Sequence, residues 1–164
     1  KTDLIVAKKQ LARMENYFHG NSSGLDPLVS FTNSPLLINE QQEIIKCSLP
    51  INIDDFFLWD SKIERKAADQ IEKFAQKMKF DDFKQIISHE SIPLSDSCIN
   101  AILENDPIAL IESFEVLSYF QLYNLDFLIP KTVQEYWKNG LESKEYFMKL
   151  CGAGGGGFFL GLKK

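Results

Sequence analysis

"YFMKLCGAGGGGFFLGL", residues 146–162, decides the fold, because two short apolar runs flank a glycine tract. Tyr146–Leu150 and Phe158–Leu162 have the length and composition of β-strands, and Gly152–Gly157 is short enough to join them as a hairpin. A flexible linker would instead lie among serine, proline and charged residues. A tight turn needs one or two glycines, so we expect a loop that approaches a ligand closely and forms an anion-binding nest.

The chain before this hairpin is predicted to be mostly helical. Asp106–Pro107 supplies an N-cap residue and a proline at the first helical position, which begins a long apolar helix reaching Leu125. Thr132–Glu135 matches a capping box and is expected to open a shorter helix. A strand at Phe56–Trp59 precedes the helical region. Further helical patterns cover 67–78, 81–88 and 95–103.

Residues 3–18 repeat apolar side chains at helical spacing, and three short strands are expected after them. The predicted strands are Leu28–Phe31, Pro35–Ile38 and Glu43–Cys47, which would form an antiparallel meander. Leu49–Asn52 is the best candidate for a linker between two parts of the chain. The fold class is therefore α+β, with an antiparallel sheet on which helices pack.

The composition limits the classes of function. Of 164 residues, 45% are hydrophobic, which indicates a globular protein, and the net charge of −5 argues against a partner bound through its phosphate backbone, so no nucleic acid is expected. No apolar run is long enough for a membrane span, so no membrane partner is expected. Cys47, Cys98 and Cys151 are widely separated, which favours reduced thiols and a cytoplasmic location.

"HGNSSGLD", residues 19–26, is the second stretch that can carry chemistry. A helix-ending loop explains its polar residues equally well, and aspartate before proline is ordinary turn chemistry. Glu15 on the preceding helix is by base rate a solvated residue. Two carboxylates near a glycine nest nevertheless suggest phosphoryl transfer, in which one carboxylate holds Mg²⁺ and the other orients an attacking hydroxyl.

The two stretches together resemble motifs of the GHMP kinases, the group that contains galactokinase, homoserine kinase, mevalonate kinase and phosphomevalonate kinase. "HGNSSGLD" is similar to the mevalonate kinase motif H-G-x-P-S-G-x-D, and "CGAGGGGF" to the C-terminal glycine motif; "WDSKIERKA", residues 59–67, is similar to the start of the second family domain. The resemblance implies ATP and Mg²⁺ as cofactors, a small-molecule alcohol as substrate and Asp26 as the catalytic residue. It implies Glu15 as the metal ligand. It also implies a substrate loop that contains His19, Ser22, Ser23 and Gly24. The phosphate loop that it implies consists of Gly152, Ala153, Gly154, Gly155, Gly156 and Gly157.

The resemblance also implies how the chain is divided. Residues 1–50 would be the end of the N-terminal domain, and residues 51–164 the C-terminal domain without its last segment. The family's N-terminal nucleotide loop is not in this sequence, so we expect a fragment that is inactive alone and is completed by a missing half or by a homodimer. Ser22 stands where mevalonate kinase has proline. A diphosphomevalonate decarboxylase-type enzyme and a non-catalytic metabolite-binding relative are the alternatives.

Overall fold

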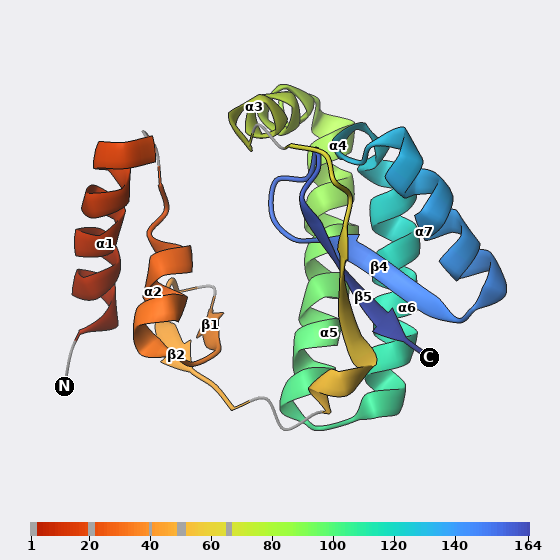
Figure 1. The fold of residues 1–164 in the computed structure, drawn as a ribbon, viewed down its shortest axis with the longest axis horizontal. Coiled ribbons are helices and arrows are strands. Elements are labelled where there is room, and N and C mark those ends of the chain that lie inside the picture. Colours follow the sequence, from red (N-terminus) through yellow and green to blue (C-terminus); the bar gives the residue numbers. More distant parts are fainter. Residues whose placement is uncertain (1–2, 20–21, 40, 49–51, 65–66) are drawn as a thin grey trace. The chain divides into compact units, whose positions relative to one another are not determined.

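The computed structural model describes residues 3–19, 22–39, 41–48, 52–64 and 67–164. The chain divides into two compact units, Lys1–Leu49 and Pro50–Lys164 (Figure 1). Each unit is described by itself. Most of the predicted linker Leu49–Asn52 lies outside the described residues. The class is α+β, as predicted, since both units combine helices with antiparallel strands.

The N-terminal unit pairs two helices with a small hairpin. The elements are α1 (Leu4–His19), α2 (Leu25–Thr32), β1 (Leu36–Ile38) and β2 (Ile44–Lys46). The first predicted helix and the last two predicted strands are confirmed, and the strands pair antiparallel with Leu37 opposite Ile45. The three-stranded meander is wrong, because α2 replaces the first of its strands.

Helix α2 forms where the strand Leu28–Phe31 was predicted, and its first turn explains the difference. Gly24 precedes it with a φ of 73°, in the left-handed region that glycine occupies without cost. Leu25 and Leu28 are three residues apart, and Leu28 is fully buried, so the short apolar run packs with helical spacing. Asn33 ends the helix, also with a positive φ.

The C-terminal unit is built on a three-stranded antiparallel sheet in the order β3-β5-β4 (Figure 1). Leu150 and Phe159 are paired residues of β4 and β5, so the glycine tract does connect a hairpin. Strand β3 pairs with the other edge of β5, with Trp59 opposite Phe159. All three predicted strands are confirmed, and their bounds are β3 (Phe56–Asp60), β4 (Tyr146–Leu150) and β5 (Phe158–Lys163).

Helices occupy the sequence between β3 and β4, and α6 packs against β4 (Figure 1). Asp106 caps α6 as predicted, because its carboxylate accepts a hydrogen bond of 2.9 Å from the Ala109 N–H. The predicted capping box at Thr132 is wrong: α7 begins at Lys131 after Pro130, and no side chain caps it. The helices are α3 (Ala67–Lys77), α4 (Asp81–Ile86), α5 (Ile92–Leu103), α6 (Pro107–Asn124) and α7 (Lys131–Ser143), with a π-helical segment (Ile87–Ser91) and 3₁₀ turns η1 (Ile53–Asp55) and η3 (Asp126–Leu128).

The core of the C-terminal unit lies between the sheet and helices α5, α6 and α7, and Trp137, Phe147 and Phe159 are fully buried in it. Strand β4 is an edge strand, and side chains of α6 satisfy its outer backbone N–H groups. The Ser118 hydroxyl accepts from the Met148 N–H at 3.1 Å and from the Trp137 indole at 2.7 Å. Covering an edge in this way prevents another strand from pairing with it. No helix in the described parts of the chain is long and apolar enough to cross a membrane.

Candidate functional site

The loop between α1 and α2 is organised by Ser22. Its hydroxyl donates a hydrogen bond to the carboxylate of Glu15 and accepts one of 3.0 Å from the Gly24 N–H. Its own backbone N–H donates to the Asn16 side chain at 2.6 Å. The structure therefore brings together three of the predicted residues, Glu15, Ser22 and Gly24, and Ser22 positions the proposed metal ligand.

Gly24 has a structural role that the sequence did not reveal. A Cβ at this position would lie less than 3.0 Å from the Lys8 carbonyl oxygen and from the Ala12 side chain, both on α1. Only glycine permits this approach together with the positive φ. The residue therefore allows the start of α2 to pack directly against α1.

Asp26 lies in the first turn of α2 and its side chain is exposed. The unpaired backbone N–H groups of a helix N-terminus favour a negative charge there. Ser23 is also exposed, and its hydroxyl accepts from the Leu25 N–H at 3.3 Å. His19 ends α1, but its side chain lies outside the described part, as do residues 20–21.

The glycine loop between β4 and β5 is held by hydrogen bonds to other parts of its own unit. The Gly155 N–H donates to the Leu128 carbonyl at 2.7 Å, and the Gly157 N–H donates to the Ile63 carbonyl at 2.9 Å. These two donors are therefore used within the protein. Five of the glycines have positive φ values: Gly152, Gly154, Gly155, Gly156 and Gly157.

Close packing explains two of these glycines. A Cβ on Gly154 would lie less than 3.0 Å from the Leu128 carbonyl oxygen, and one on Gly156 equally close to the Ile63 carbonyl oxygen. The sequence predicted close approach to a ligand, whereas here the backbone approaches the backbone of the same unit. Gly152 is exposed and Ala153 half-buried, so this end of the loop is the accessible one.

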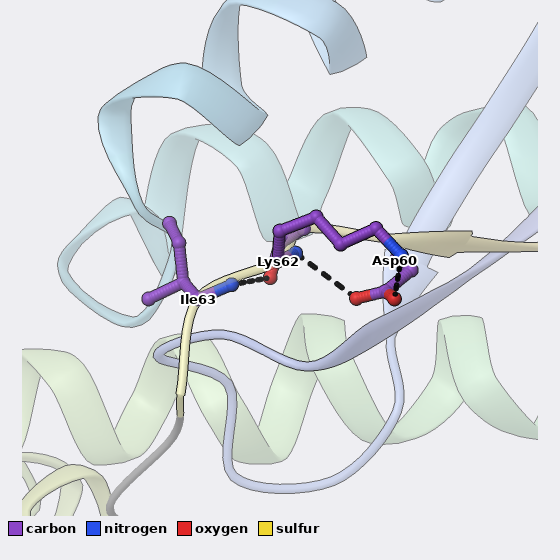
Figure 2. Close-up of polar contacts among 4 residues, drawn as sticks. Asp60, Lys62 and Ile63 are labelled. Carbon is purple, nitrogen blue, oxygen red and sulfur yellow. Dashed lines mark hydrogen bonds and ion pairs between the residues drawn. The ribbon is translucent and has the colours of Figure 1, made fainter.

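A polar loop after β3 lies against the glycine loop and is hydrogen-bonded to it. The sequence analysis did not include this polar loop in the site. The Ser61 N–H donates to the Gly157 carbonyl at 2.9 Å, and Figure 2 shows the turn that holds this segment. The Lys62 ammonium lies 2.7 Å from the Asp60 carboxylate, and this hydrogen bond lowers the pKa of Asp60. The Ser61 hydroxyl accepts from the Ile63 N–H at 3.3 Å.

The signal for this loop was in the sequence, since a strand that pairs antiparallel with β5 ends beside the glycine tract: Asp60 is the residue opposite Phe158. The predicted site residues thus fall into two groups. Glu15, Ser22, Ser23, Gly24 and Asp26 belong to the N-terminal unit, and the glycine loop to the C-terminal unit. Comparison with known proteins adds no assignment: no family model matches this chain, and no curated protein matches it.

Proposed function

We propose that the intact protein transfers the γ-phosphoryl group of ATP to a hydroxyl of a small metabolite, as a mevalonate kinase-like member of the GHMP type. The observation that carries the proposal is Asp26, an exposed carboxylate in the first turn of α2, two residues after the buried Gly24. This carboxylate is free to meet a substrate from solvent, and its backbone is fixed by the packing of Gly24 on α1.

Asp26 would orient the attacking hydroxyl. An aspartate carboxylate is a much weaker base than an alkoxide, so positioning contributes more than removal of the proton before transfer. Because the residue lies on a helix and not in the loop itself, its direction is set by α2.

Glu15 would contribute to a Mg²⁺ site together with nucleotide oxygens. Among the described residues no three acidic, histidine or cysteine side chains converge on a common point. Mg²⁺ commonly takes one or two protein carboxylates and fills its other positions with water and phosphate oxygens, so a single glutamate is compatible with it. The Ser22 hydroxyl donates to one carboxylate oxygen of Glu15, so the other oxygen would be the one that binds the ion.

The accessible end of the glycine loop would bind phosphate oxygens. Gly152 and Gly154 have positive φ values while Ala153 does not, and such an alternation turns successive N–H groups toward one side as an anion nest. The fixed hydrogen bonds at Gly155 and Gly157 make the loop preorganised, which is what electrostatic stabilisation of a transition state requires.

The test is ADP release by the complete gene product with Mg-ATP and a panel of mevalonate, phosphomevalonate, homoserine and simple sugars. The proposal predicts ADP release that depends on one of these alcohols, and a phosphorylated product without release of carbon dioxide. Carbon dioxide released in proportion to ADP would replace the proposal with a decarboxylase. Ligand binding without ADP release would identify a metabolite-binding protein instead.

A further inference from the structure

A second feature of the glycine loop is independent of phosphoryl transfer: a pocket of about 320 Å³ opens beside its first residues. This volume is at the lower end of the roughly 300–1,000 Å³ that ligand pockets span, so the pocket fits a small molecule. Helix α3, helix α6, the turn η3 and the end of β4 form its walls, and Gly152 and Ala153 form part of its rim.

Two side-chain amides line the pocket, those of Gln70 and Gln121, and the more deeply buried one is that of Gln121, which is 8% exposed. Its Oε1 accepts a hydrogen bond of 2.8 Å from the Leu150 N–H. A backbone N–H can only donate, so the oxygen must be the atom that faces β4, and the amide nitrogen must face away from the strand.

The amide nitrogen of Gln121 is available to a ligand. It donates to none of the described residues. In the described parts every fully buried side-chain nitrogen or oxygen has a hydrogen-bond partner, so the Gln121 nitrogen is not fully buried. The nitrogen therefore keeps contact with open space, and this pocket is a space that Gln121 lines. A nearly buried donor that points into a cavity selects a ligand with a hydrogen-bond acceptor.

The remaining lining selects against charge. No charged residue is among the described residues that line the pocket, and its walls are mostly apolar, with Ile71 and Phe74 from α3 facing Leu128 and Leu150. Burying an ion there without a partner would cost several kcal/mol. A phosphate or carboxylate group is thus a poor occupant of the pocket itself, although its rim shares Gly152 and Ala153 with the anion nest proposed for the loop.

We propose that this pocket binds a small, uncharged, mainly apolar molecule through one acceptor atom, such as a carbonyl oxygen, hydrogen-bonded to the Gln121 amide nitrogen. The ligand body packs between α3 and the end of β4. Because Gly152 and Ala153 line the pocket, the bound molecule also contacts the accessible end of the glycine loop. The proposal does not depend on kinase activity.

Acetophenone is a suitable probe, since it carries one carbonyl acceptor on an apolar ring and has no charge. Benzoate has nearly the same shape and is ionised at neutral pH, and ethylbenzene has the shape without the acceptor. We expect acetophenone to shift the NMR signals of the Leu128 and Leu150 methyl groups and of the Ala153 amide in the 164-residue chain. Benzoate is expected to bind at least about tenfold more weakly because of its charge, and ethylbenzene more weakly because it leaves the donor unpaired.

The matched variants are Ile71→Lys and Ile108→Lys. Both isoleucines are well exposed, at 61% and 70%, so both variants should fold, but only Ile71 lines the pocket. Ile71→Lys should weaken acetophenone binding about fivefold or more and Ile108→Lys should leave it unchanged. Shifts centred on other residues, equal affinity for benzoate, or equal effects of the two variants would overturn the proposal.

Discussion

Replacing Gly154 with alanine tests whether the glycine loop is packed against its own unit. The residue has a φ of 76°, which costs a residue with a side chain about 1–2 kcal/mol. The added Cβ would also lie less than 3.0 Å from the Leu128 carbonyl oxygen, which already accepts the 2.7 Å hydrogen bond from the Gly155 N–H. The carbonyl cannot move away without weakening that bond, which contributes about 0.5–1.5 kcal/mol.

Gly152→Ala is the matched control, because Gly152 also has a positive φ, 98°, but is exposed. Alanine lowers the conformational entropy of the unfolded chain, which stabilises both variants by about 0.4–1 kcal/mol and offsets part of the loss. We expect a loss of about 2 kcal/mol in the free energy of unfolding for Gly154→Ala and of about 1 kcal/mol for Gly152→Ala.

Urea unfolding followed by tryptophan fluorescence measures both values. The chain has two tryptophans, Trp59 and Trp137, and both lie in the C-terminal unit that carries the loop. Equal losses for the two variants, to within about 0.5 kcal/mol, would mean that Leu128 does not confine Gly154 and would refute the packing argument.

Two further predictions concern the C-terminal unit. Ser118→Ala should lower the free energy of unfolding by about 2–4 kcal/mol in urea unfolding, because it leaves the Trp137 indole and a β4 amide without their buried acceptor. The control is Ser97→Ala at an exposed position, which should change the free energy of unfolding by no more than about 0.5 kcal/mol. Equal effects of the two substitutions would contradict the role of Ser118. Burial, and then the 2.7 Å hydrogen bond to a carbonyl of α7, raise the pKa of Tyr146. The stability from this group is therefore complete below the unfolded pKa of about 10 and is lost as the pH rises above it. Between pH 9 and pH 11, Tyr146→Phe should lose less of its free energy of unfolding than the wild type does in the same assay. The same dependence of the free energy of unfolding on pH in both proteins would contradict this prediction.

The sequence predicted the elements whose signals are local. The β4–β5 hairpin followed from apolar runs on both sides of a glycine tract, and α6 from the cap at Asp106. Leu28–Phe31 was predicted as a strand because four apolar or small residues do not distinguish the two periods. What decides for the helix is Gly24, whose contact with Lys8 on α1 is a tertiary one.

The candidate site was predictable as a set of residues and not as a geometry. The resemblance to a kinase motif singled out Glu15 and Asp26, but the hydrogen bond from Ser22 to Glu15 depends on how the loop folds back on α1. The glycine tract was recognised as a special loop, yet Leu128 and Ile63, which receive its hydrogen bonds, lie far away in the sequence. No local pattern tells which glycine N–H groups remain for a ligand.

The most direct test of the proposed function compares Asp26→Asn with Asp69→Asn in the complete gene product. Both aspartates are exposed, and they lie in the first turn of α2 and of α3. Each substitution therefore removes a similar favourable interaction with a helix N-terminus, about 0.3–1 kcal/mol. We predict that Asp26→Asn lowers acceptor-dependent ADP release by about 10²-fold or more while Asp69→Asn leaves it unchanged. Near-normal ADP release from Asp26→Asn would contradict the account.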